Sequence, residues 1–427
     1  MKCDVAVIGA GAAGLAAARM LSGAGKRVCI IEARARAGGR VATLHVPDLP
    51  LPIELGAEFL HGEAQASFAI ADAASLAVCR LPDDHCWSGE GRCSRIRDFW
   101  GQLDGVRARI GTLRRDVSFA AFLRSHRSIP PRLRTLACAF VEGYHAAHAD
   151  RISAFALRMA DGEQSENKQF RFAGGYDALI EWLQAGLDPR RVEIRLGTVA
   201  NVVQWSRGSV MIRCRSTTAD AEERVRARAI IITIPIGVWK APRDQEGAIQ
   251  FDPPLREKER ALARIEAGHV VKIAFRFRER FWEKDGWNFV HSSDRFMPTW
   301  WTTAPLRSPI LTGWAGGHAA DALLAERPAM IDRALDSMSR AFGIARRRLD
   351  ALLVGTWTHD WQSDPFSRCA YSYAAVGGSG AHAALARPIA KTLFFAGEAT
   401  SSDETGTVSG AIATGLRASK QVLLSMG

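Results

Sequence analysis

A two-part α/β fold is predicted by three features of the 427-residue sequence. Two short apolar runs at 4–8 and 27–32 flank a glycine-rich turn and an alanine- and leucine-rich stretch at 13–24, which indicates a strand–helix–strand unit. Residues 95–160 have a mostly helical pattern, whereas residues 191–235 have the texture of β-strands. The length of the chain also favours two or three domains over a single core.

Sequence patterns predict further helices and strands along the chain. Helices are expected at 176–187, 328–343 and 407–425, and strands at 192–196, 199–204, 209–215, 229–235, 269–277, 351–356 and 393–396. No internal repeat and no low-complexity segment interrupts this pattern.

The composition is that of an ordinary globular protein, with 47% hydrophobic and 24% charged residues. No apolar run reaches the roughly 18 residues that a membrane span needs. Met1 and Lys2 lead directly into the first apolar run without a signal-peptide pattern, so a cytoplasmic location is expected.

The net charge of +11 comes from dispersed lysines and arginines, with local clusters only at 132–134 and 346–348. No nucleic-acid-binding motif accompanies them, so we expect neither a nucleic acid nor a membrane as partner. The eight cysteines form no CxxC pair and no zinc-ligand spacing with histidine, so reduced thiols and no metal site are expected.

The most specific local signal is the glycine pattern of the first turn, which follows a strand and opens a helix. Gly9 permits the tight turn, Gly11 lets a pyrophosphate approach the backbone, and Gly14 lets the helix pack closely on the strand. Glu32 ends the second apolar run, where a carboxylate can accept hydrogen bonds from a ribose. These residues predict a dinucleotide bound at the helix N-terminus.

The residues after Glu32 decide which dinucleotide is expected. With Glu32, the run Gly38-Gly39-Arg40 resembles the E-x-x-x-x-x-G-G-R pattern of the flavin-containing amine oxidases. The paired glycines allow a second close backbone approach, and Arg40 can neutralise a cofactor phosphate. Nicotinamide dehydrogenases do not usually show this run, so FAD is the expected cofactor.

The resemblance to this family continues along the chain in family order. Glu54–Gly62 resembles a G-A-x-aromatic-x-H-G segment, Ile230–Val238 a V-T-V-P-L-G-V-L segment, Trp361–Pro365 and Tyr371–Tyr373 the W-x-x-D-P and S-Y-S-Y segments, and Leu393–Thr400 with Gly406–Ala411 the C-terminal flavin motif. The match is best with the polyamine oxidase and lysine demethylase branch. Residues 80–170 and 280–350 carry no recognisable motif.

The resemblance implies a Rossmann-like FAD-binding domain of the discontinuous GR2 type and an α+β substrate-binding domain. The FAD-binding domain is expected from 1–80, 190–265 and 385–427, and the substrate-binding domain from 81–189 and 266–384. The ligand would lie between them, at the carboxyl ends of the parallel strands.

The residues expected to contact FAD come from all of the matching segments. They are Gly9, Gly11, Ala13, Gly14, Glu32, Ala33, Arg34, Gly38, Gly39, Arg40, Gly56, Ala57, Glu58, Phe59, Val199, Thr233, Pro235, Trp361, Gly397, Glu398, Gly406, Thr407, Val408 and Ala411. Backbone N–H groups of the C-terminal segment would hold the flavin carbonyl and the phosphate arm.

Five residues are expected at the reacting end of the site. Lys272 matches the family lysine that is bridged through water to flavin N5, and it would assist reoxidation by oxygen. Trp361 and Tyr371 would form aromatic walls, and His61 would orient an amine. Thr407 stands where monoamine oxidases have an aromatic residue, which indicates a roomier site.

The attachment of the flavin is expected to be non-covalent. Monoamine oxidases attach it through a cysteine just before the cage tyrosine. In this chain Ala370 separates Cys369 from Tyr371, so the register differs by one residue.

The resemblance implies an FAD-dependent amine oxidase. The α-carbon of a neutral amine would deliver hydride to flavin N5, the imine would hydrolyse to an aldehyde, and oxygen would be reduced to hydrogen peroxide. A polyamine-type or a primary or secondary amine is the expected small-molecule substrate, with oxygen as the second. Glu58, Asp161 and Glu163 are candidates for binding its ammonium group.

Three alternatives remain open. An L-amino acid oxidase would need an arginine for the substrate carboxylate, which Arg158 or Arg171 would have to supply. A flavin desaturase or isomerase would use the same cofactor without producing peroxide from amines. A flavin-holding binding protein would show little turnover.

Overall fold

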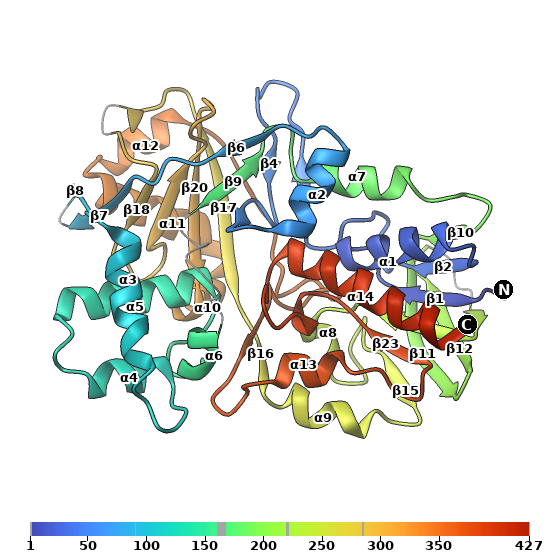
Figure 1. Ribbon diagram of the computed structural model, residues 1–427. Coiled ribbons are helices and arrows are strands. Elements are labelled where there is room, and N and C mark those ends of the chain that lie inside the picture. The colour runs from blue at the N-terminus through green and yellow to red at the C-terminus, as the bar shows by residue number, and fades with distance from the viewer. Residues whose placement is uncertain (1, 90, 160–167, 219–221, 284–285, 427) are drawn as a thin grey trace.

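The computed structural model describes residues 2–89, 91–159, 168–218, 222–283 and 286–426. Its elements form two parts that lie side by side in Figure 1, one around a parallel sheet and the other around a larger mixed sheet.

The first part is built on a five-stranded parallel sheet. In spatial order its strands are β10 (Val192–Arg195), β2 (Val28–Ile31), β1 (Val5–Ile8), β14 (Ala229–Ile232) and β23 (Leu393–Phe395). All four pairings are parallel. Every residue of β1, β2, β14 and β23 is buried, which is the pattern of a sheet covered on both faces.

Helices cover one face of this sheet, and a second sheet covers the other face. The helical layer contains α1 (Ala12–Gly23), α2 (Gln65–Ala73), α7 (Asp177–Ala185) and α14 (Val408–Met426). The opposite layer is a four-stranded sheet in the order β13 (Glu222–Ala227), β12 (Ser209–Ser216), β11 (Thr198–Ser206) and β15 (Gln250–Asp252). Alternate residues of β1 face the two layers, Val5 and Val7 the helices and Ala6 and Ile8 the sheet.

The two ends of the chain meet in the helical layer, where α14 lies along α1 (Figure 1). A Cβ atom on Gly415 would lie 2.2 Å from the backbone oxygen of Ala13, so the two helices approach backbone to backbone. Ser419 also donates a hydrogen bond of 3.2 Å to the carbonyl of Ala17. The C-terminal helix therefore supports the helix that follows the first glycine turn.

The second part is built on a seven-stranded sheet. Its order is β21 (Leu353–Thr358), β17 (Val270–Phe277), β20 (Ile310–Gly316), β19 (Thr299–Thr302), β18 (Phe289–His291), β7 (His85–Gly89) and β8 (Arg92–Arg95). Helices α10 (Gly317–Ala325), α11 (Met330–Phe342) and α12 (Arg346–Leu352) belong to the same part. A helical arm with its own core contains α3 (Phe99–Ile110), α4 (Phe119–Ser125), α5 (Pro131–Tyr144) and α6 (Ala154–Met159).

The remaining elements are short. They are the sheet of β5 (Leu60–His61), β9 (Gln169–Phe172) and β6 (Val78–Arg80), the pairs β3 (Thr43–Leu44) with β4 (Ile53–Glu54) and β16 (Ile265–Ala267) with β22 (Ser372–Ala374), and the helices α8 (Ile236–Trp239), α9 (Arg256–Leu262), α13 (Ala381–Ala386), η2 (Arg327–Ala329) and η3 (Glu398–Thr400). Within the described ranges, no helix combines the length and the apolar character that crossing a bilayer requires.

For two of the expected strands, neighbouring elements explain why the bounds differ from those expected. The strand expected at 351–356 begins at Leu353, because α12 continues to Leu352 with an ion pair of 2.8 Å between Arg346 and Asp350 along its exposed face. The strand expected at 229–235 ends at residue 232. Pro235 has no backbone N–H for a sheet and instead precedes the helical turn α8.

The close contact between α1 and α14 predicts a large effect of one added methyl group. We expect Gly415→Ala to lower the free energy of unfolding by about 1–3 kcal/mol, because backbone atoms must shift to admit the new Cβ atom. Chemical unfolding of the purified protein measures this change.

Gly105→Ala is the matched control, since Gly105 is also inside a helix and a Cβ atom there meets nothing within 4 Å. It should raise the free energy of unfolding by about 0.5–1 kcal/mol. Equal effects of the two substitutions would contradict the proposed backbone contact.

Candidate active site

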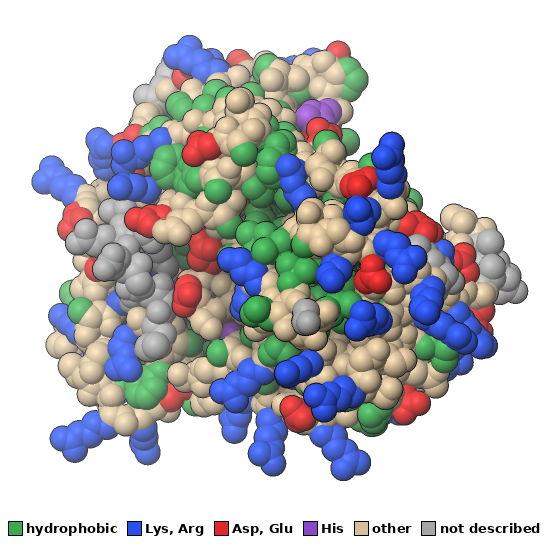
Figure 2. All heavy atoms as spheres, turned by 45° about the vertical axis from the view of Figure 1, so that its right-hand side comes forward, with side chains coloured by type: hydrophobic (Ala, Val, Ile, Leu, Met, Phe, Trp, Pro, Cys, Tyr) green, Lys and Arg blue, Asp and Glu red, His purple; other side chains and the backbone are tan. Residues whose placement is uncertain are grey.

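A cavity of about 1740 Å³ is lined by residues of both parts of the chain. Ligand sites for small molecules are commonly about 300–1,000 Å³, so this cavity has room for a dinucleotide together with a substrate. On the face shown in Figure 2, hydrophobic side chains gather in a hollow, and lysine and arginine side chains stand around it.

The glycine turn forms one end of the cavity. Gly9 has φ +101°, and a Cβ atom on it would lie 2.5 Å from Oγ1 of Thr233. Gly14 is closed in more tightly, because a Cβ atom there would lie 2.0 Å from the Gly9 carbonyl oxygen. Gly11 is the N-cap residue of α1 and provides no side-chain cap, so the first N–H groups of the helix are open to an anion.

Glu32 holds this turn in place through both carboxylate oxygens. One accepts a hydrogen bond of 2.7 Å from the backbone N–H of Ala10, and the other accepts one of 2.9 Å from the backbone N–H of Arg34. A carboxylate oxygen can accept more than one hydrogen bond, so Glu32 can also receive a ribose hydroxyl.

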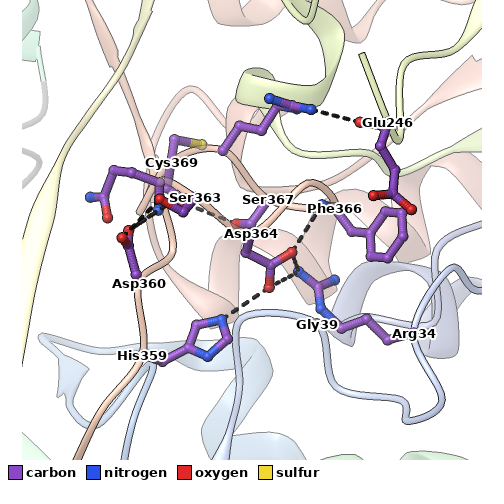
Figure 3. Close-up of polar contacts among 12 residues, drawn as sticks. Arg34, Gly39, Glu246, His359, Asp360, Ser363, Asp364, Phe366, Ser367 and Cys369 are labelled. Carbon is purple, nitrogen blue, oxygen red and sulfur yellow. Dashed lines mark hydrogen bonds and ion pairs between the residues drawn. The ribbon is translucent and has the colours of Figure 1, made fainter.

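Arg34 lies just after β2, and an ion pair joins it to Asp364 in the loop between β21 and β22 (Figure 3). Its guanidinium donates to both carboxylate oxygens of Asp364, each at 2.8 Å. His359 contacts the same carboxylate at 3.0 Å. Although burial opposes ionisation, the hydrogen bonds from His359 and Arg34 and the charge of Arg34 hold the pKa of Asp364 well below its usual range.

A second buried pair joins the Gly-Gly-Arg run to the C-terminal motif. Arg40 donates a hydrogen bond of 3.0 Å to Glu398 and one of 2.6 Å to the carbonyl of Ala370. The other oxygen of Glu398 accepts hydrogen bonds from the backbone N–H and the hydroxyl of Ser372, at 3.2 and 2.7 Å. Three segments that are far apart in the sequence therefore converge beside the cavity.

Lys272 lies in the seven-stranded sheet and contacts the loop of Glu58. Its Nζ is 2.6 Å from Glu58 and 3.1 Å from the carbonyl oxygen of Gly56. The carboxylate of Glu58 also lies 3.5 Å from the guanidinium of Arg171, and it accepts a hydrogen bond of 3.1 Å from the indole N–H of Trp301. Burial opposes its ionisation, but the charges of Lys272 and Arg171 outweigh that cost and lower the pKa of Glu58.

The aromatic candidates are held rigidly by hydrogen bonds to backbone. Trp361 donates a hydrogen bond of 3.0 Å to the carbonyl of Leu55, and Tyr371 donates one of 2.8 Å to the carbonyl of Tyr144. Thr407 has a different role in the fold, because its hydroxyl accepts from the N–H of Gly410 at 2.9 Å at the start of α14. Both aromatic rings and Thr407 line the cavity.

His61 lies in the cavity wall with its ring edge-on to Tyr144, at a centroid distance of 5.0 Å. Its buried Nδ1 has no hydrogen-bond partner among the residues that the structure describes. Burial lowers the pKa of His61 to about 4 and that of its neighbour His145 to about 3. Both rings are therefore neutral at neutral pH.

Nearly all of the residues expected to contact the cofactor lie together in the cavity wall. These are Gly9, Gly11, Ala13, Glu32, Ala33, Arg34, Gly38, Gly39, Arg40, Gly56, Ala57, Glu58, Phe59, Val199, Thr233, Pro235, Trp361, Gly397, Glu398, Gly406, Thr407, Val408 and Ala411. Gly14 does not line the cavity and instead packs beneath the turn. The lining thus fits an extended dinucleotide, whose phosphates the open N-terminus of α1 would hold.

Other candidate residues lie elsewhere. Arg158 is exposed on the surface, and Arg171 is buried behind Glu58, outside the wall of the main cavity. Cys369 is fully buried and does not line the cavity. Asp161 and Glu163 lie outside the described residues.

Several wall residues were not expected from the sequence. They are aromatic or histidine side chains of the helical arm and the seven-stranded sheet: His85, Phe99, Trp100, Phe140, Tyr144, His145, Phe289, His291, Trp301 and Trp314. They come from 80–170 and 280–350, where no motif marks them. The alternation of aromatic residues along a strand, as in Phe289 and His291, is the one local signal that could have indicated a shared face.

Comparison with known proteins identifies a family for almost the whole chain. The model of the family described as flavin containing amine oxidoreductase matches residues 12–423. Human lysine-specific histone demethylase 2 is 27% identical over 98% of this chain, and polyamine oxidase 3 of Oryza sativa subsp. japonica is 29% identical over 97% of it. The chain spans 53% of the length of the demethylase and 88% of that of the polyamine oxidase.

Solved structures show the same fold. A putrescine oxidase bound to putrescine superposes with a TM-score of 0.81 at 21% identity, and each chain is 99% covered. Cyclohexylamine oxidase from Brevibacterium oxydans has a TM-score of 0.81 at 20% identity, also with 99% of each chain covered.

The buried contact of Lys272 with Glu58 predicts a strongly destabilising substitution. We expect Glu58→Gln to lower the free energy of unfolding by about 3–5 kcal/mol, because it leaves buried cations without their counter-charge. Urea unfolding of the holoenzyme measures the change, and the double variant Glu58→Gln with Lys272→Met should recover part of it.

Glu279→Gln is the control, because its partner Arg348 and its own carboxylate are both well exposed. Surface pairs of this kind often contribute nothing measurable. If Glu58→Gln lowered the free energy of unfolding as little as Glu279→Gln does, the buried pair of Glu58 and Lys272 would not stabilise the fold.

Proposed function

Because the chain belongs to the family of flavin-containing amine oxidoreductases, we propose that it is an FAD-dependent amine oxidase. The proposed substrate is a primary or secondary amine of the polyamine type, with oxygen as the electron acceptor. Relatives whose names include polyamine oxidase 3 and polyamine oxidase 2 support this substrate class.

The observation that carries the proposal is the continuity of one cavity between two chemically different ends. One end has the glycine turn, Glu32 and Arg40, which suit a dinucleotide. The other end has aromatic walls and neutral histidines, which suit an organic amine. Lys272 and Trp361 line the same cavity from two different elements.

Bound FAD supplies the hydride acceptor and the route of electrons to oxygen. The chain's own residues then orient the substrate and control its protonation. Trp361 and Tyr371 present rigid aromatic surfaces that exclude water from the amine. The neutral rings of His61 and His145 provide no acid that would reprotonate it.

Lys272 has three N–H donors, and Glu58 and the Gly56 carbonyl take two of them. We propose that the third donates to a water molecule in the cavity and assists the reaction with oxygen. Glu58 is itself engaged by Lys272 and Trp301, which does not favour its use as the ammonium-binding carboxylate.

The cavity does not favour the amino acid oxidase alternative. The arginines that line it among the described residues are Arg34, Arg40 and Arg417. Arg34 and Arg40 are paired with carboxylates, and Arg417 donates to backbone carbonyls of the C-terminal motif. Neither Arg158 nor Arg171 faces the cavity, so no spare guanidinium is placed for a substrate carboxylate in the part that the structure describes.

We propose non-covalent FAD, because Cys369 is turned away from the cavity. Its thiol is fully buried beside Ile236 and Leu385, and burial raises its pKa to about 11. A protonated, enclosed thiol is a poor nucleophile. Acid precipitation distinguishes the two forms, since only covalent flavin stays with the protein.

We also propose the division into a FAD-binding and a substrate-binding domain, with one adjustment. Helix α7 packs against α1 in the helical layer, so the segment at 177–185 belongs with the FAD-binding domain. A cytoplasmic location stays a prediction.

Anaerobic flavin bleaching tests the proposed activity. We expect polyamines, diamines or monoamines to bleach the visible flavin band of the holoenzyme, whereas common L-amino acids should leave it unchanged. Bleaching by amino acids alone would replace the proposal with an amino acid oxidase. If none of these compounds bleached the flavin, the alternative of a flavin desaturase or isomerase would be favoured.

The pH dependence of kcat/KM should report the substrate amine rather than a histidine of the site. Because burial already lowers the pKa of His61 to about 4, this ring stays neutral as the pH rises from neutral to alkaline values. We therefore expect activity to rise towards alkaline pH as the amine loses its proton.

A less basic amine should shift this rise in kcat/KM to lower pH, and His61→Phe should leave its position unchanged. Steady-state rates with two amines of different basicity measure both effects. If kcat/KM rose at the same pH for every substrate, the ionising group would belong to the protein, and the assignment to the substrate amine would be wrong.

A further inference from the structure

Two stacked histidines lie in the cavity wall, on strands β7 and β18. His85 and His291 are both buried, with 4% and 9% of their surface exposed, and both line the cavity. Nδ1 of His85 is 2.9 Å from Nε2 of His291, and the two ring planes are within 9° of parallel. Neither ring has a role in the proposed oxidation of the amine.

Asp83 determines which ring nitrogens carry hydrogen. Its carboxylate lies 3.0 Å from Nε2 of His85 and accepts a hydrogen bond of 2.8 Å from the indole N–H of Trp100. Burial opposes ionisation of Asp83, but the hydrogen bonds from His85 and Trp100 keep its pKa below the usual range. An ionised carboxylate only accepts hydrogen bonds, so Nε2 of His85 must be the protonated nitrogen.

The arrangement of the remaining hydrogens follows step by step. Burial lowers the pKa of His85, and that of His291 lies well below its usual value, so both rings are neutral. With its hydrogen on Nε2, His85 accepts through Nδ1 from the Nε2–H of His291. Nδ1 of His291 is then the ring nitrogen that is left to accept a hydrogen bond.

Aromatic rings pack beside the histidine pair. Phe99 stacks on His85 at 3.9 Å and lies 5.1 Å from His291, nearly parallel to both rings. Phe289 also stacks on His85, at 4.8 Å. These rings offer no hydrogen-bond donor to the Nδ1 of His291, so this nitrogen favours a donor group of a ligand over an anionic or acceptor group.

The acceptor lies on the same sheet as the lysine end of the site. Trp301 is the cross-strand partner of Phe289, and its ring lies 5.9 Å from Nζ of Lys272. His291 is two residues beyond Phe289 on the same face of β18, a step of about 7 Å along the strand. A chain-like substrate can thus reach His291 with one end while the other end is near Lys272.

We propose that His291 is a specificity-determining residue whose Nδ1 accepts a hydrogen bond from the second nitrogen of a substrate oxidised at its first nitrogen. Asp83 is a positioning residue that acts through His85 by holding the tautomer. This inference rests on the proposed amine oxidase function and names the feature that selects among amines.

The experiment compares diamines with monoamines of equal chain length, putrescine with butylamine and cadaverine with pentylamine, on the holoenzyme. We expect the wild-type protein to prefer each diamine. His291→Phe should lower kcat/KM for the diamines by about tenfold or more, as expected for a lost hydrogen bond to a charged group. The monoamine values should change by less than about twofold, because they do not reach the acceptor.

Two further substitutions separate recognition from folding. His291→Gln keeps an acceptor and should retain part of the preference for diamines. Asp83→Ala should weaken that preference through KM, whereas Asp84→Ala should not, because the carboxylate of Asp84 pairs with Arg95 on the outer side. The visible flavin spectrum and the melting temperature of each holoenzyme report whether it is folded.

The outcomes distinguish this inference from the function on which it rests. If the wild-type protein oxidises monoamines as well as diamines of equal length, or His291→Phe lowers both to the same extent, the inference is overturned and the amine oxidase proposal stands. If neither kind of amine reduces the flavin, both are overturned. Loss of the preference in His291→Phe and Asp83→Ala alone supports the inference.

Discussion

The requirement that buried charges be paired organises the centre of this protein. Lys272 of the seven-stranded sheet is 4% exposed and finds its counter-charge in Glu58, which belongs to the loop between β4 and β5. An unpaired ion at this depth would cost several kcal/mol. The two parts of the chain are therefore held in one relative position at the place where the cavity passes between them.

The same requirement recurs on the cofactor side of the cavity. Arg40 with Glu398 and Arg34 with Asp364 each join residues more than 300 positions apart. Because each carboxylate also accepts hydrogen bonds from backbone or hydroxyl groups, the pairs hold loops as well as side chains. A pre-formed cradle of this kind reduces the ordering that cofactor binding would otherwise require.

The substrate end follows a different physical rule. Its wall is aromatic, and its histidines are kept neutral by burial, so it presents few fixed charges to a substrate. Such a wall offers no acid to a bound ligand, and it leaves selectivity to a small number of directed hydrogen bonds. The family relation explains the cofactor cradle, while described residues of 80–170 and 280–350 line the proposed substrate end.

Features that depend on neighbouring residues could be predicted from the sequence. They are the glycine turn, the first βαβ unit and the order of the flavin motifs, because a tight turn and a close helix contact need glycine at set positions. Which distant groups meet depends on how the whole chain folds. His85 and His291 are 206 residues apart, and their contact depends on the pairing of β7 with β18, which no local pattern specifies. The same holds for Lys272 and its partner Glu58, which lie in segments far apart in the sequence. Side-chain charges become specific partners only after folding removes them from water, and that step is a property of the whole chain.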